Sequence, residues 1–203
     1  MIVRKLKESE KEYYEKLIEK YGAVFGQLSW LKIFGDKVQI YDIFNKGKNL
    51  IGGFYFYKQK KFGLTIYRNP PFTPFVGPFL EVKAKNPVSI MAIWKKVLSL
   101  MAEFTESLPC SIISFSLNKN IVDTQPFYWK RFKIVPQYTY VLDLNNSVED
   151  IYRGMSSARR RNLIKGERDG LIVKEVSDFK IVSSLVCKTF LRQGKRVDEY
   201  YLN

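Results

Sequence analysis

Residues 38–58 predict an antiparallel hairpin at the centre of a β-sheet. They read VQIYDIF (38–44), NKGKN (45–49) and LIGGFYFYK (50–58). The two outer runs are rich in β-branched and aromatic residues, as strands are, and the run between them has the composition of a turn. Two adjacent glycines, Gly52 and Gly53, lie inside the second run and indicate a bulge or the close approach of another backbone.

Further elements are expected on both sides of this hairpin. We expect a helix over 10–21, because Ser9 and Glu12 have the spacing of a capping box and Gly22 supplies a stop. Residues 69–78 hold four of the eight prolines, which predicts an ordered extended loop. The remaining patterns predict a third strand at 64–67, an amphipathic helix at 88–107, a buried strand at 110–117, a short helix or turn at 123–132 and a long strand at 133–144.

The pattern restarts after Leu144. Ser147 and Ser156 are predicted to cap two helices, the second of them basic and ending near Gly170. A strand at 171–176 and a helix from 178 to about 193, capped by Ser177, complete the pattern. One strand with a few helices can hardly bury a core of its own. Either this part docks on the first unit, or the chain is a truncated piece of a longer protein. We expect a mixed α/β protein, with a first domain over 1–144 and the start of a second domain, truncated, over 145–203.

Composition limits the chemistry. The 203 residues include 34 Lys and Arg against 20 Asp and Glu, a net charge of +14 that favours phosphates, anionic lipid or nucleic acid as partners. A simply basic, solvated surface is the alternative. The absence of histidine excludes Ser-His-Asp and Cys-His catalysis and any histidine metal site. Two isolated cysteines, Cys110 and Cys187, support neither a zinc site nor a disulfide framework. A cytoplasmic protein without a transmembrane segment is expected.

The strongest charge feature is the run Arg159, Arg160 and Arg161, followed by Lys165 and Arg168. On a helix, Arg161, Lys165 and Arg168 form a line on one face, beside free amides at the helix start. This pattern favours anion binding, and a solvated helix face explains it equally well. A non-catalytic module that binds RNA or another polyanion through 159–168 is therefore a competing function, although no known RNA-binding signature accompanies the run.

Six short motifs occur in a characteristic order along the chain. They are Gln27-x-x-Trp30-x-Lys32, Gly52-Gly53, PFTPFVGP (71–78), DTQPFYWKRF (123–132), SSARRRNLIK (156–165) and TFLRQG (189–194). Together they resemble the FemAB-like (FemABX peptidyltransferase) branch of the GNAT-fold acyltransferases. The resemblance extends over nearly the whole chain but only over the N-terminal part of the family's two-domain plan.

The resemblance implies a GNAT-like first domain, with a central mixed sheet flanked by helices, and an incomplete second GNAT-like domain. It implies a transferase without a bound cofactor, which moves an acyl or aminoacyl group from acyl-CoA or aminoacyl-tRNA to an amine. The acceptor would be a phosphorylated peptidoglycan or polysaccharide precursor. Transfer RNA and a peripheral contact with an anionic membrane are the other partners that we expect.

Site residues also follow from the resemblance. Lys32, beside Trp30, and Arg192 would hold the diphosphate of an acceptor, and the basic segment Arg159, Arg160 and Arg161 would lie near the cleft. Asp123 would handle the proton of the amine, and its alternative role is to cap the helix that starts at Gln125. Direct attack by an amine needs no histidine. The usual Q/R-x-x-G-x-G/A donor loop of the family does not occur, so we expect the donor half to be missing or to lie elsewhere, and this chain alone to be inactive.

Overall fold

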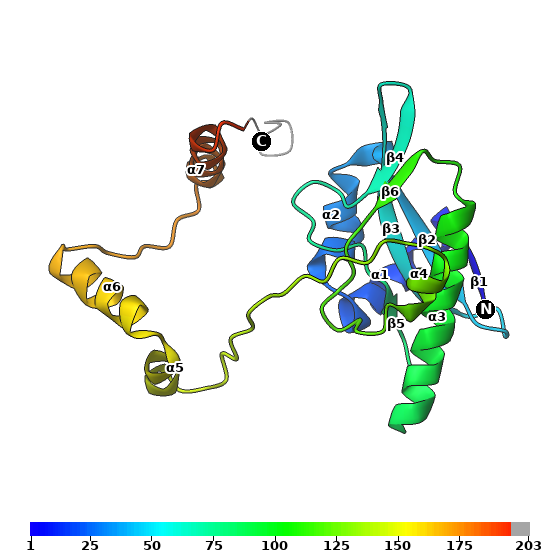
Figure 1. Cartoon of the computed structure of the whole chain (residues 1–203), viewed down its shortest axis with the longest axis horizontal. Helices are drawn as coiled ribbons and strands as arrows, with labels where there is room; N and C mark the ends of the chain where they lie inside the picture. Colours follow the sequence, from blue (N-terminus) through cyan, green and yellow to red (C-terminus); the bar gives the residue numbers. More distant parts are fainter. Residues whose placement is uncertain (196–203) are drawn as a thin grey trace. The chain divides into compact units, whose positions relative to one another are not determined.

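The structure is a computed structural model that describes residues 1–195 (Figure 1). Its contacts divide the chain into two compact units, Met1–Gln137 and the residues from Tyr138 onward. This division lies N-terminal to the expected domain boundary at Leu144. Each unit is described by itself below.

The first unit contains one mixed β-sheet. The strands follow the order β1 (Ile2–Lys5), β2 (Val38–Phe44), β3 (Leu50–Lys61), β4 (Leu64–Arg68) and β6 (Ile112–Ser114), and β5 (Phe79–Leu80) also pairs with β3. All pairs are antiparallel except β4 and β6, which are parallel. The sheet confirms the expected hairpin and the mixed α/β class. Strands β1 and β5 are too short for the sequence pattern to have predicted them.

Helices flank both faces of this sheet (Figure 1). On one face, α1 (Lys11–Tyr21) packs against β3, and α2 (Leu28–Lys32) leads into Phe34, whose ring lies 6.1 Å from that of Tyr57. On the other face, α3 (Pro87–Ser107) brings Phe104 to 5.9 Å from Phe54, and α4 (Gln125–Trp129) contacts α3. Because successive side chains of a strand alternate between faces, β3 supplies core residues to both layers. Three short 3₁₀ turns connect these elements: η1 (Glu8–Glu10), η2 (Val24–Gly26) and η3 (Gly35–Lys37).

The two glycines of β3 behave as the sequence predicts. A Cβ atom on Gly52 would lie 2.2 Å from the carbonyl oxygen of Phe79, so β5 approaches closely only because no side chain is present. The β2–β3 register also shifts between Ile43 and Phe44, opposite Gly52. Of the two alternatives, the close approach is confirmed at Gly52, and the bulge lies next to it, at Ile51.

The expected capping box of the first helix is wrong. The 3₁₀ turn η1 precedes α1, the N-cap is Glu10, and the amide of Lys7 donates to Glu10 Oε2 over 3.3 Å. Ser9 therefore lies inside the 3₁₀ turn instead of preceding the helix. The predicted end of the helix is correct, since the amide of Gly22 donates to the carbonyl oxygen of Ile18 over 2.9 Å.

Two expected strands are absent from the described residues. Residues 133–144 form no strand despite their alternation, and Tyr138 and Tyr140 are fully exposed there. Residues 171–176 form none either. A strand requires a partner for its hydrogen bonds, and within residues 1–195 neither segment has one. The strand expected at 110–117 is real but short, and Ile112 in it is 47% exposed instead of buried.

The second unit contains α5 (Val148–Gly154), α6 (Ser157–Arg168) and α7 (Phe179–Arg192). Ser147 and Ser156 cap the first two helices as predicted, since their hydroxyls accept from the amides of Asp150 and Arg159. The last helix is capped by Asp178 and not by Ser177. None of the residues 138–195 is buried.

Candidate functional site

Trp30 is anchored on α2 by a polar contact and by aromatic packing. Its indole Nε1 donates to Thr73 Oγ1 over 3.0 Å, and its ring packs edge-on against Phe25 (5.4 Å) and Phe34 (6.2 Å). The geometry fixes the indole against the proline-rich loop. The sequence identified Trp30 but missed Thr73, for which no spacing signal exists.

The proline-rich loop, residues 69–78, is held by the side chain of Asn69 at its start and by backbone hydrogen bonds near its end. Asn69 Nδ2 donates to the carbonyl oxygen of Thr73 over 3.0 Å, and Asn69 Oδ1 accepts from the amide of Ser116 over 3.0 Å. The amide of Val76 donates to the carbonyl oxygen of Ser116, and the amide of Tyr55 donates to that of Val76. This network confirms the expectation of an ordered loop.

Lys32 is the last residue of α2 and is exposed. It lies two residues after Trp30, so the fixed indole sets the position of the backbone that carries the ammonium group. A cation at a helix C-terminus is stabilised by the helix dipole. The surface around Lys32 therefore combines an exposed charge with an anchored aromatic side chain.

Asp123 lies in the turn before α4. Its Oδ1 accepts from the amide of Gln125 over 3.0 Å, and its Oδ2 lies 4.0 Å from Lys95 Nζ. The contact to Gln125 is the one that the capping interpretation predicts, with Thr124 as the formal N-cap residue. The side chain is 39% exposed and so remains accessible to solvent.

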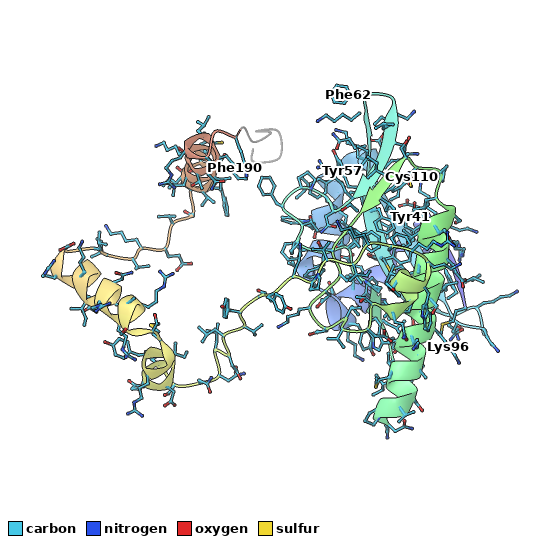
Figure 2. All side chains as sticks on the ribbon, in the orientation of Figure 1. Tyr41, Tyr57, Phe62, Lys96, Cys110 and Phe190 are labelled. Carbon is cyan, nitrogen blue, oxygen red and sulfur yellow. The ribbon has the colours of Figure 1, made fainter. Side chains whose placement is uncertain are left out.

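Lys95 contacts Asp123 and also lines an open groove beside α3. Lys95 Nζ donates to Gln125 Oε1 over 2.6 Å and lies 4.9 Å from the centre of the Trp129 ring. The groove has a volume of about 920 Å³ and runs between α3 and the β2–β3 turn, with Lys46, Lys95 and Lys96 among its lining residues. Figure 2 labels Lys96 on α3. The sequence did not single out this groove, because its lysines come from separate segments.

The three consecutive arginines of α6 have different surroundings. Arg160 Nη1 donates to the carbonyl oxygens of Arg153 and Met155, each over 3.0 Å. Arg160 therefore closes the C-terminal end of α5. Arg159 and Arg161 are exposed, and no acceptor for either guanidinium is found within residues 1–195.

Arg192 is the last residue of α7 and is exposed. It lies at the C-terminal end of the helix, where the dipole favours the cation itself but opposes an incoming anion. Any anion bound there would be held by the guanidinium and not by free backbone amides.

The structure brings together some of the predicted site residues. Trp30 and Lys32 share α2 on one face of the sheet, whereas Asp123 lies before α4 on the opposite face. The four arginines belong to the second unit. Within residues 1–195, no group of three or more acidic, cysteine or histidine side chains could hold a metal ion, and no helix has the length and hydrophobicity that a membrane span needs.

Comparisons with known proteins find similar solved structures but no matching protein family. No family model and no curated protein matches the chain. A ribosomal-protein-alanine N-acetyltransferase from Brucella melitensis is 13% identical with a TM-score of 0.43, covering 70% of this chain and 97% of the other. An acetyltransferase from Trypanosoma brucei is 15% identical with a TM-score of 0.39, covering 70% and 98%. A GNAT family acetyltransferase from Staphylococcus aureus is 18% identical with a TM-score of 0.36, covering 70% and 98%. These values are too low to establish a family or an activity for this chain.

Proposed function

We propose that this chain belongs to an N-acyltransferase of the FemAB-like kind. The observation that carries the proposal is the parallel pair β4 and β6, which α3 connects at the edge of an otherwise antiparallel sheet. This is a central mixed sheet flanked by helices, the arrangement that the six sequence motifs imply. The acyltransferase activity in this proposal is inferred from the order of those motifs, which resembles that of the FemAB-like proteins.

The reaction is direct transfer to an amine. The amine nitrogen forms a bond to the carbonyl carbon of the donor, and the bond from that carbon to the donor's sulfur or oxygen breaks. The amine proton passes to a carboxylate or to water, and the leaving sulfur or ribose oxygen takes up a proton and departs as free CoA or tRNA. Orientation and hydrogen-bond donors for the developing oxyanion suffice for this chemistry. A protein without histidine can therefore catalyse it.

The acceptor would bind through exposed cations. In the first unit, Lys32 follows the anchored Trp30 and would bind a phosphate charge of the acceptor. In the second unit, Arg192 ends α7 and would bind phosphate through its guanidinium. Within the second unit, exposed Arg159 and Arg161 would also bind phosphate, whereas the guanidinium of Arg160 already donates to the carbonyl oxygens of Arg153 and Met155. Asp123 caps α4 on the opposite face of the sheet from Lys32, so the proton of an amine bound beside Lys32 would pass to water.

The natural full-length polypeptide should transfer an acyl group from acyl-CoA or aminoacyl-tRNA to an amine on a nucleoside-diphosphate-linked acceptor. Lys32→Ala and Arg192→Ala should each raise the KM for that acceptor about tenfold, and leave the KM for an unphosphorylated amine unchanged. Lys119→Ala is the matched control, because Lys119 is exposed elsewhere on the first unit. No transfer with either donor over a broad panel of amines would refute the proposal.

A second candidate function rests on the unpartnered arginines of α6. If Arg159 and Arg161 bind RNA, the affinity should fall steeply with salt, and replacing both by alanine should reduce the slope of log K against log salt by about 2. A salt-independent affinity would reject this function.

A further inference from the structure

The β3–β4 hairpin projects beyond the rest of its sheet. Strand β2 pairs with β3 only as far as Tyr57, whereas β3 and β4 stay paired from Tyr57 and Arg68 to Lys61 and Leu64. Strand β6 pairs with β4 no further than Ile66. The amide of Ser111 still donates to the carbonyl oxygen of Thr65 over 2.9 Å, so residues 60–64 form the two-stranded ribbon at the end of the sheet. Figure 2 shows Phe62 at its tip, with its ring directed away from the body of the unit.

Phe62 does not pack into the hydrophobic core. Its side chain is 90% exposed, and Leu64 beside it is 42% exposed. The two turn residues, Phe62 and Gly63, have φ angles of +51° and +78°, which is the pattern of a type I′ turn. Asparagine is the residue that such a turn prefers before glycine, and an aromatic side chain is disfavoured there. Phe62 thus costs stability at a position where it makes no core contact.

All charged residues of the ribbon below the tip are basic. Residues 57–68 contain Lys58, Lys60, Lys61 and Arg68, and no acidic residue. Lys58 pairs across the ribbon with Tyr67, and Lys61 pairs with Leu64. Since neighbouring residues of a strand face opposite sides, Lys60 and Lys61 lie on opposite faces of the ribbon. The lysines therefore lie on both faces of the ribbon, next to its apolar tip. The turn η3 contributes one acidic residue, Asp36, which is followed by Lys37.

We infer that this hairpin docks the protein on an anionic lipid bilayer. Phe62 and Leu64 would enter the interface between headgroups and acyl chains, and the lysines, which begin about 3 Å further along the ribbon, would meet the lipid phosphates. Each lysine near an anionic leaflet strengthens binding roughly fivefold. A single-stranded RNA could also stack on Phe62, but an apolar pair at the tip with compact ammonium groups behind it fits a bilayer better than a base. The inference does not depend on acyl transfer.

The test is sedimentation of the full chain with vesicles made of equal parts of phosphatidylcholine and phosphatidylglycerol, and with vesicles of phosphatidylcholine alone. We expect binding to the anionic vesicles only. Phe62→Asn should weaken binding at least about tenfold, because the apolar anchor is lost. The same variant supplies the preferred turn residue, so thermal stability should stay equal or rise. Replacing Lys58, Lys60 and Lys61 by glutamine should weaken binding about a hundredfold.

Matched control variants distinguish the effect of this hairpin from the effects of overall net charge and of exposed hydrophobic residues elsewhere. Phe72→Asn makes the same change at another exposed phenylalanine with positive φ (+54°), far from any lysine in sequence. Replacing Lys5, Lys20 and Lys119 by glutamine removes the same charge from other exposed positions. Both controls should keep vesicle binding nearly unchanged. In a second measurement, Phe62→Trp should gain quenching by brominated lipids in anionic vesicles.

Three results would overturn the inference. The first is absence of binding to anionic vesicles. The second is an equal loss in the hairpin variants and in their matched controls. The third is a loss of affinity for single-stranded RNA, but not for vesicles, in Phe62→Asn, which would assign the tip to nucleic acid.

Discussion

Arg4 and Asp42 lie opposite each other in the β1–β2 ladder, yet their side chains do not pair. Arg4 forms its ion pair with Glu10, and both carboxylate oxygens of Asp42 are buried without a hydrogen-bond partner among the described residues. The Arg4 guanidinium instead lies 4.2 Å from the centre of the Phe44 ring. A buried carboxyl without a partner favours its neutral form.

This arrangement predicts an unusual pH dependence of stability. Burial and the nearby negative charge of Glu10 raise the pKa of Asp42 to about 7, and Arg4 only partly opposes them. Because the folded state then holds a proton that the unfolded chain releases, the free energy of unfolding should fall as pH rises from about 4 to about 7. The slope should not exceed about 1.4 kcal/mol per pH unit. Urea unfolding measured across this range checks it.

The range from pH 4 to pH 7 suits this measurement, because the chain has no histidine that would titrate within it. Asp42→Asn should flatten the dependence, whereas Asp36→Asn, at an exposed position, should leave it intact. A stability that rises with pH over the same range in the unaltered protein would contradict the assignment.

Gly52→Ala should disrupt the contact between β3 and β5. The added methyl group would meet the carbonyl oxygen of Phe79 at 2.2 Å and the Cα atom of Leu80 at 3.0 Å, and both belong to backbone that cannot move alone. We expect a loss of about 2–4 kcal/mol in the free energy of unfolding. Gly47→Ala, in the β2–β3 turn with its nearest neighbour at 3.3 Å, should cost less than about 1 kcal/mol. Equal losses in both variants would show that β5 does not pack as described.

Thr73→Val should loosen the anchor of Trp30. The change removes the oxygen that accepts from Trp30 Nε1 and donates to the carbonyl oxygen of Pro71. Leaving these groups unsatisfied should cost about 1–3 kcal/mol. Thr73→Ser keeps the hydroxyl and should recover most of the loss. Chemical denaturation followed by tryptophan fluorescence measures both, and a Thr73→Val protein as stable as the unaltered one would exclude this role.

The three consecutive arginines of α6 should differ in how their replacement by alanine changes the rates of amide hydrogen exchange. Arg160→Ala removes the donor that satisfies the carbonyl oxygens of Arg153 and Met155, so amides at the α5–α6 junction should exchange several times faster. Arg159→Ala and Arg161→Ala should leave them unchanged. Equal acceleration in all three variants would mean that charge, and not this contact, holds the junction.

Local signals predicted most of the first unit. The hairpin, its turn and the two glycines follow from residue types alone, and so does the end of α1 at Gly22. Most of the hydrophobic stripe of α3 packs into the core, but Met91 near the start of the helix is 68% exposed. Helical spacing identifies a face and does not show how far the sheet beneath it extends.

The errors arise where structure depends on distant partners. The alternation of residues 133–144 is typical of a strand, yet a strand also needs an edge to pair with, which periodicity does not report. The site shows the same limit. Trp30 could be identified from a motif, but its partner Thr73 is 43 residues away in sequence. The Lys95–Asp123 contact likewise joins separate segments, so no spacing rule reveals it.

The measurement that tests the account most directly is acyl transfer by the natural full-length polypeptide, with acyl-CoA and aminoacyl-tRNA as alternative donors and a nucleoside-diphosphate-linked amine as acceptor. The account predicts an acylated amine with one of the donors, and a KM for the acceptor that rises about tenfold in Lys32→Ala but not in Lys119→Ala. No acylated product with either donor, from a protein shown to be folded, would contradict it.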